Sequence, residues 1–132
     1  MNKPKAQAVI IDDNVLNSEI LATLLENSGL EAIYIASPRE IMPTLATLGN
    51  LRVIFLDLEM PNYNGYDILQ VFRGEPALND VPIIAYTVHT NQVESIRQAG
   101  FDGFLGKPLI PAQFPSQIER ILTGKAVWEF GG

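Results

Sequence analysis

Short apolar runs alternate with helix-like segments along this chain, and this alternation constrains its fold more than any other feature. Apolar runs of strand length occur at Ala8 to Ile11, Ala32 to Ile35, Val53 to Leu56 and Val81 to Tyr86, with a weaker fifth at Gly103 to Gly106. Continuous runs of this length are typical of parallel strands buried on both faces. The repeated strand-helix order therefore predicts a parallel sheet with right-handed crossovers and helices on both faces.

Between the runs, apolar residues recur at helical spacing. The signals are Leu16, Ile20 and Leu24 for a first helix, Ile68, Leu69 and Phe72 for a third, Val93, Ile96 and Ala99 for a fourth, and Phe114, Ile118 and Ile121 for a fifth. Gly29, Gly74 and Gly100 stand where these helices are expected to end.

The second helix is the least regular of the five. Ser37-Pro38-Arg39-Glu40 fits a capping box with proline at the first helical position. Pro43 falls inside the same segment, where it removes a backbone donor and clashes with the preceding turn. We therefore expect this helix to be kinked, to be short, or to begin later than the capping box suggests.

Length and composition favour one domain in an ordinary reducing compartment. The 132 residues suffice for a single core, and the chain contains no cysteine. Its apolar runs are far shorter than the roughly 20 residues of a membrane-spanning helix, and no leader-like segment opens the chain. The net charge of −6 argues against direct binding to nucleic acid. We expect a cytoplasmic protein with no membrane contact.

Charged residues follow three of the predicted strands. Asp57 ends the run Val53 to Leu56, Asp12 and Asp13 follow another run, and Lys107 follows a third. Because ligands of open α/β sheets bind beyond the carboxyl ends of the strands, these groups should share one site. Three carboxylates there would repel one another unless a cation joined them, and magnesium prefers such oxygen ligands. With positive charge from the metal and Lys107, Asp57 has the chemistry of a phosphoryl acceptor.

These residues together resemble the receiver domain of response regulators, the CheY-like switches of two-component signalling. The resemblance rests on the paired acids, the turn Asp57-x-x-Met60-Pro61-x-x-x-Gly65, Thr87 and Lys107-Pro108. It covers residues 7–123, which leaves 1–6 as a short N-terminal extension and 124–132 as a C-terminal tail. It implies a flavodoxin-like, doubly wound, five-stranded parallel sheet of order 2-1-3-4-5 with five helices.

The resemblance also implies a role for each matching residue. Asp57 would accept phosphate from a phosphohistidine of a histidine kinase or a histidine phosphotransfer protein. Asp13, Asp57 and the main-chain carbonyl of Glu59 would bind Mg²⁺, with Asp12 reaching the ion through water. Lys107 would pair with Asp57 and then with the phosphoryl group, and the Lys107-Pro108 bond would be cis.

The implied output is a change in a protein-binding surface. Thr87 would hydrogen-bond a phosphoryl oxygen, and Phe104 would turn inward as Thr87 moves. Helix four, strand five and helix five would then bind a downstream target protein, with the receiver as a monomer or a phosphorylation-dependent dimer. The path from Thr87 to Gly100 is shorter than in most receivers, so we expect helix four to start late or to lose a turn.

Two local features remain open in the sequence. Glu59 and His89 each lie two residues beyond a site residue, and we hypothesise that they face each other and control the hydrolytic water; alternatively, both are solvated. Trp128 and Phe130 lie in the tail. They either dock on the domain itself, which we favour, or contact a second chain, or belong to a linker.

Simpler interpretations and other functions compete with the switch. Asp12 and Asp13 alone could be acids that the helix dipole favours at a helix N-terminus. Thr87 could be a strand-forming residue without a role in the site, and Phe104 could be an ordinary core residue. A Mg²⁺-dependent aspartyl-phosphate hydrolase of the haloacid dehalogenase kind would want an aspartate where Glu59 stands. An unphosphorylated docking module would not need Asp57 and Lys107 together.

Overall fold

The computed structural model describes residues 5–61, 63–88 and 90–129. The strands are β1 (Gln7–Ile11), β2 (Glu31–Ile35), β3 (Leu51–Asp57), β4 (Ile83–Thr87), β5 (Gly103–Gly106) and β6 (Trp128–Glu129). The α-helices are α1 (Val15–Asn27), α2 (Ile41–Leu45), α3 (Gly65–Arg73), α4 (Val93–Ala99) and α5 (Phe114–Leu122). The 3₁₀ turns are η1 (Pro38–Glu40), η2 (Pro76–Leu78) and η3 (Thr90–Gln92).

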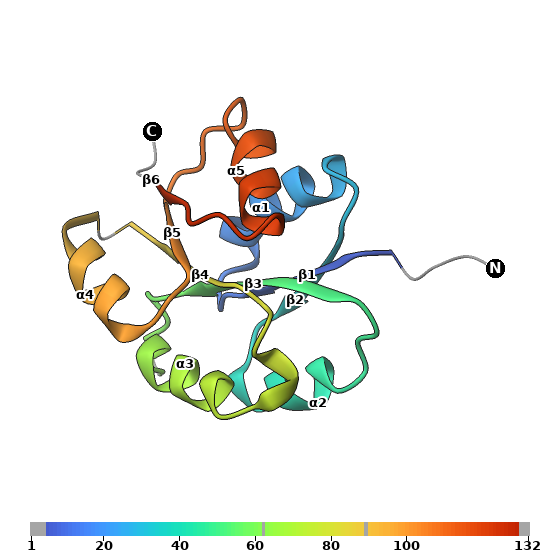
Figure 1. The fold of residues 1–132 in the computed structure, drawn as a ribbon, viewed down its shortest axis with the longest axis vertical. Coiled ribbons are helices and arrows are strands. Elements are labelled where there is room, and N and C mark those ends of the chain that lie inside the picture. The colour runs from blue at the N-terminus through green and yellow to red at the C-terminus, as the bar shows by residue number, and fades with distance from the viewer. Residues whose placement is uncertain (1–4, 62, 89, 130–132) are drawn as a thin grey trace.

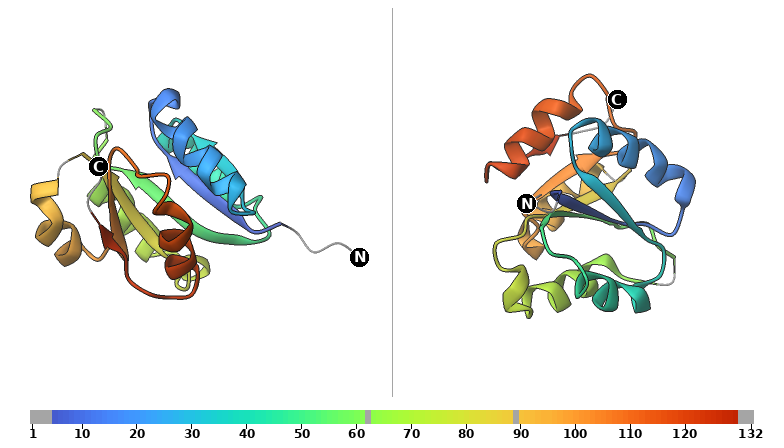
Figure 2. Two further views of the ribbon diagram at one scale, coloured as in Figure 1. Left: turned by 90° about the horizontal axis from the view of Figure 1, so that it is seen from above. Right: turned by 90° about the vertical axis from the view of Figure 1, so that its right-hand side faces the viewer.

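The strands form one parallel sheet in the order β2-β1-β3-β4-β5-β6. Helices α1 and α5 lie on one face of this sheet, and α2 and α3 lie on the other (Figures 1 and 2). Successive strand residues serve opposite faces: Val9 and Ile54 join the core under α3, while Ile10 and Phe55 join the core under α1 and α5. The doubly wound fold and the strand order 2-1-3-4-5 are confirmed.

The short strand β6 extends the sheet beyond the five predicted strands. It pairs in parallel with β5, with Trp128 opposite Phe104, and the Phe104 amide donates to the Val127 carbonyl at 2.7 Å. Arg120 holds Glu129 through two hydrogen bonds of 2.8 and 3.0 Å. Trp128 thus docks on the domain itself, as favoured, whereas Phe130 lies outside the described residues.

Helix α2 is short and begins late, as the proline within it predicted. The chain first makes the 3₁₀ turn η1, and α2 then spans five residues that include Pro43. The predicted capping box is wrong, because the Ser37 side chain makes no capping hydrogen bond. The Glu40 amide, which a capping box would satisfy with the Ser37 hydroxyl, donates instead to the Ser37 carbonyl at 2.9 Å.

Helix α4 begins at Val93 after the 3₁₀ turn η3, in agreement with the expected late start. It ends at Ala99 and is capped by Gly100, whose φ of 106° lies in the left-handed region that glycine adopts at little cost. Ile96 anchors α4 to the same core as α2 and α3. The seven residues of α4 therefore form a short helix held by a single fully buried side chain.

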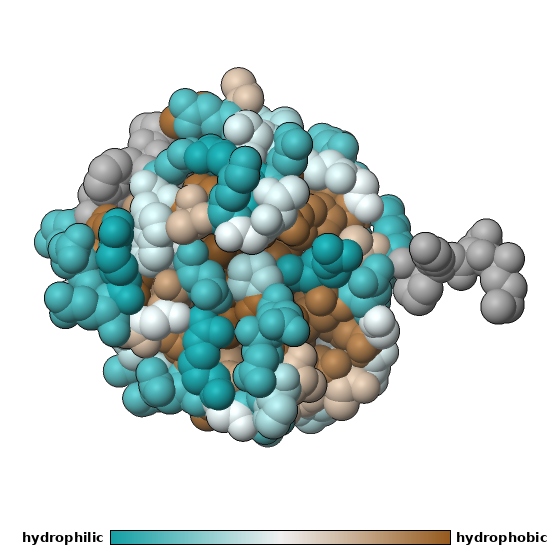
Figure 3. Space-filling model, in the orientation of Figure 1, coloured by the Kyte–Doolittle hydropathy of each residue, from teal (hydrophilic) through white to brown (hydrophobic). Residues whose placement is uncertain are grey.

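Hydrophilic side chains cover much of the face in Figure 3, with apolar atoms visible in the gaps between them. The larger exposed apolar side chains include Val15, Leu16 and Ile20 on α1. Among the described residues, no helix combines the length and the apolar character needed to cross a membrane.

Candidate functional site

The carboxyl ends of β1, β3 and β5 bring the predicted charged residues together. Asp57 is the last residue of β3 and is 2% exposed, and Asp12, which follows β1, is fully buried. Asp13 is exposed at the rim. One carboxylate oxygen from each of the three aspartates lies within 4.8 Å of the others. The structure thus gathers the three acids that the sequence placed at one edge.

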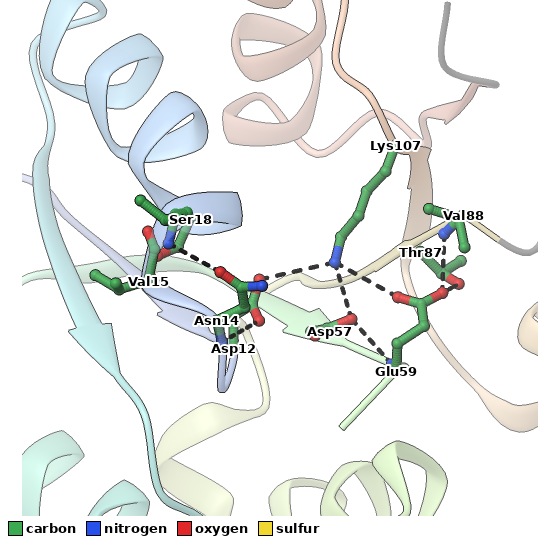
Figure 4. Close-up of polar contacts among 10 residues, drawn as sticks. Asp12, Asn14, Val15, Ser18, Asp57, Glu59, Thr87, Val88 and Lys107 are labelled. Carbon is green, nitrogen blue, oxygen red and sulfur yellow. Dashed lines mark hydrogen bonds and ion pairs between the residues drawn. The ribbon is translucent and has the colours of Figure 1, made fainter. Parts of the chain in front are cut away.

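Lys107, directly after β5, supplies positive charge to this cluster (Figure 4). Its Nζ lies 3.0 Å from Asp57 Oδ1, 3.4 Å from Glu59 Oε2 and 3.7 Å from Asp12 Oδ2. Burial alone would lower the pKa of Lys107, but the hydrogen bond to Asp57 and the surrounding carboxylate charges outweigh burial and raise it. The lysine therefore remains an ammonium ion at neutral pH.

The buried carboxylate of Asp12 is only partly satisfied by the protein. Its Oδ1 accepts a hydrogen bond from the Asn14 amide at 2.9 Å. Its Oδ2 is buried and accepts no hydrogen bond from the described residues. A buried carboxylate oxygen without a donor, beside two other carboxylates, suits a hard divalent cation. The carboxylate oxygens of Asp12, Asp13 and Asp57 therefore fit Mg²⁺ as ligands.

Glu59 lies across the site from Asp12, and its side chain turns inward. The Glu59 amide donates to Asp57 Oδ1 at 2.9 Å, which fixes the start of the turn after β3. Glu59 Oε1 accepts hydrogen bonds from the Thr87 hydroxyl and from the Val88 amide, the latter at 2.8 Å. Burial and the neighbouring Asp57 raise the pKa of Glu59, against the opposing effects of Thr87, Val88 and Lys107.

Sequence reasoning missed two contributors to the site. Tyr86 lies on β4 with its ring 4.6 Å from Lys107 Nζ, a cation–π contact, and burial followed by nearby negative charge raises the pKa of Tyr86 to about 12. The Val88 amide points at Glu59. Tyr86 was not predicted because a tyrosine inside an apolar run is typical of a core residue. The Val88 amide was not predicted because every residue other than proline has a backbone N–H, so the residue type gives no indication of its role.

The remaining predicted residues have mixed outcomes. The Lys107–Pro108 bond is cis, the isomer that the resemblance implied. Phe104 is fully buried in β5, and its switching role stays a prediction. His89 lies outside the described residues, so its proposed pairing with Glu59 also stays a prediction.

The family model for the response regulator receiver domain matches residues 8–119. The polar-differentiation response regulator DivK of Brucella ovis is 29% identical over 116 residues, which cover 86% of this chain and 94% of the relative. The DivK protein of Brucella anthropi is 29% identical over 121 residues, or 90% and 97% of the two chains.

Solved structures show the same fold. The chemotaxis response regulator CheY4 of Vibrio cholerae superposes with a TM-score of 0.77 at 22% identity, over 89% of this chain and 99% of that one. The CheY-like response regulator receiver domain from Methylobacillus flagellatus gives a TM-score of 0.76 at 25% identity, with the same coverage.

Proposed function

Because the chain belongs to the response regulator receiver domain family, we propose that it is a phosphoacceptor switch in which Asp57 carries the phosphoryl group. The observation that carries this proposal is the position of Asp57, at the buried end of β3 with Lys107 Nζ at 3.0 Å and two further aspartates beside it. Residues 7–123 would form the receiver, flanked by 1–6 and by the 124–132 tail, which adds β6 to its sheet.

In the proposed reaction, an Asp57 carboxylate oxygen attacks the phosphorus of a phosphohistidine. The new P–O bond forms as the P–N bond breaks, and the departing imidazole keeps the nitrogen electron pair and takes up a proton. The product is an acyl phosphate on Asp57. The donor would be a histidine kinase or a histidine phosphotransfer protein, since the receiver itself supplies no phosphohistidine. Loss of the phosphoryl group would follow by attack of water on phosphorus.

The residues around Asp57 are suited to this reaction. Lys107 already holds Asp57 Oδ1 and would offset the negative charge that the phosphoryl group brings. The Thr87 hydroxyl at the end of β4 would donate to a phosphoryl oxygen. Asp12, Asp13, Asp57 and the Glu59 main-chain carbonyl would hold Mg²⁺, which supplies positive charge to the transferring group when bound.

The signal would leave the site through β4 and β5. Thr87 and Phe104 lie on these neighbouring strands, and the proposed output surface consists of α4, β5 and α5, with a downstream target protein as its partner. Strand β6 lies along β5, and Arg97 of α4 sits 4.7 Å from the Trp128 ring. The tail therefore contributes to the surface that a partner would meet.

Intact mass spectrometry tests the proposal. The protein is incubated with phosphoramidate or acetyl phosphate and Mg²⁺, and phosphate release from a phosphomonoester is measured in parallel. A single adduct that is absent from Asp57→Asn supports the switch. Rapid turnover of phosphomonoesters would indicate a hydrolase instead, and the absence of any adduct would indicate a docking module.

A further inference from the structure

We propose that the Glu59 side chain occupies the phosphoryl pocket of the unphosphorylated protein and must leave it before Asp57 can accept a phosphoryl group. This inference rests on the proposed function, and it assigns Glu59 a role that sets how readily the site is phosphorylated. The Glu59 carboxylate would thus stand in for the phosphoryl group in the resting state.

The first support is the set of donors that the Glu59 carboxylate engages. The Thr87 hydroxyl and the Val88 amide donate to its Oε1, and Lys107 Nζ lies 3.4 Å from its Oε2. The three donors come from the end of β4, the residue after it and the residue after β5. Donors that converge in this way suit an anion with several oxygens, and a carboxylate and a phosphoryl group both meet that description.

The second support is the position of the Glu59 carboxylate next to the acceptor. Lys107 Nζ contacts Asp57 Oδ1 and Glu59 Oε2 together, so the two carboxylates share one ammonium ion (Figure 4). A phosphoryl group on Asp57 would need the same ammonium ion and the Thr87 hydroxyl. The Thr87 hydroxyl has a single proton to donate and cannot serve both anions at once, so phosphorylation requires the Glu59 side chain to turn away.

The side chain has room to leave. Asp57 is 2% exposed, whereas the Glu59 side chain is 24% exposed and belongs to the turn after β3. The Glu59 side chain can therefore turn out of the pocket toward solvent without a rearrangement of the core. These contacts of the Glu59 side chain stabilise the resting state by roughly the free energy of one charge-assisted hydrogen bond, and they must be broken before phosphorylation. A variant without this side chain should therefore phosphorylate Asp57 about 10- to 100-fold faster.

Two substitutions distinguish the effect of the Glu59 side chain filling the phosphoryl pocket from the effect of its negative charge. Glu59→Gln keeps the shape and one acceptor oxygen but removes the negative charge, and Glu59→Ala empties the pocket. We expect the phosphorylation rate with phosphoramidate and Mg²⁺, followed by intact mass, to rise in the order wild type, Glu59→Gln, Glu59→Ala. Glu75→Ala, a change at an exposed glutamate between α3 and η2, is the matched control and should react at the wild-type rate.

A second measurement needs no phosphate. In the NMR spectrum of the resting protein, the Val88 amide proton should resonate downfield because a carboxylate accepts its hydrogen bond. This shift should be lost in Glu59→Ala and kept in Glu75→Ala. An unchanged Val88 amide in Glu59→Ala would overturn the inference, as would equal phosphorylation rates in all variants. Equal but measurable phosphorylation rates in all variants would leave the proposed phosphoacceptor function intact. The absence of a phosphoryl adduct in every protein would overturn both that function and the inference about Glu59.

Discussion

Lys107 Nζ lies 3.0 Å from Asp57 Oδ1 and 3.7 Å from Asp12 Oδ2, so one ammonium ion serves two buried carboxylates that come from different strands. The lysine side chain is itself only 9% exposed. Electrostatic interactions in this poorly solvated setting are stronger than those of a surface pair. The stability of the resting protein therefore depends on Lys107.

Replacing Lys107 with methionine should destabilise the protein. The substitution keeps most of the side-chain volume but leaves Asp12 and Asp57 without their shared cation. We expect the free energy of unfolding at pH 7 without divalent cations to fall by about 3 kcal/mol. Urea denaturation measures this change. Adding Asp57→Asn to Lys107→Met should restore part of the loss, and two independent, additive effects would contradict the coupling.

Magnesium should stabilise the folded chain through the aspartate cluster. A ligand present at 100 times its dissociation constant adds about 2.7 kcal/mol to the free energy of unfolding. We expect Asp13→Asn to weaken this stabilisation, and because Asp13 is exposed its loss should not disturb the core. Asp80→Asn, a change at an exposed aspartate after η2, is the control. Equal Mg²⁺-induced shifts in melting temperature for all three proteins would argue against a cluster site.

The buried phenol of Tyr86 should make stability fall in alkaline solution. Its folded pKa is raised from 10.0 to about 12. Between these values the unfolded chain loses the proton while the folded chain retains it, so stability is full below pH 10 and declines above it. The decline should be on the order of 2–3 kcal/mol by pH 12.

Tyr86→Phe isolates this contribution, because it keeps the ring beside Lys107 and removes the hydroxyl. Denaturation at pH 9 and pH 11 should show a smaller loss for Tyr86→Phe than for the wild type. Identical losses would mean that the Tyr86 hydroxyl does not titrate differently in the folded and unfolded chains.

Gly103→Ala should detach strand β6. A Cβ at Gly103 would lie 2.7 Å from the Val127 carbonyl oxygen and 2.9 Å from Ile84 Cδ1, so the tail backbone would have to move. We expect a stability loss of about 1–3 kcal/mol and a red-shifted emission from Trp128, the single tryptophan of the chain. Gly49→Ala, where an added Cβ meets nothing within 4 Å, should change neither property.

The parallel sheet and the charged edge could be predicted because both depend on patterns of residue type, whereas the strand order was implied by the resemblance to receiver domains. Continuous apolar runs marked the buried strands, and Asp12, Asp57 and Lys107 followed them directly. Strand β6 was missed because it is two residues long, and its place depends on contacts with Phe104 and Arg120 that no local pattern encodes.

The inward turn of Glu59 was also beyond sequence reasoning. The residue was singled out for its position near the acceptor, and His89 was its proposed partner. Its contacts within the described residues are with Thr87, Val88 and Lys107, and one of these is a backbone amide. Which donors a flexible carboxylate meets depends on the tertiary arrangement of β3, β4 and β5.

Intact mass after exposure to phosphoramidate and Mg²⁺ tests the central claim, the phosphorylation of Asp57, most directly. The account predicts one adduct of a single phosphoryl group on the wild-type protein and none on Asp57→Asn. The same adduct on Asp57→Asn, or no adduct on the folded wild-type protein, would contradict it.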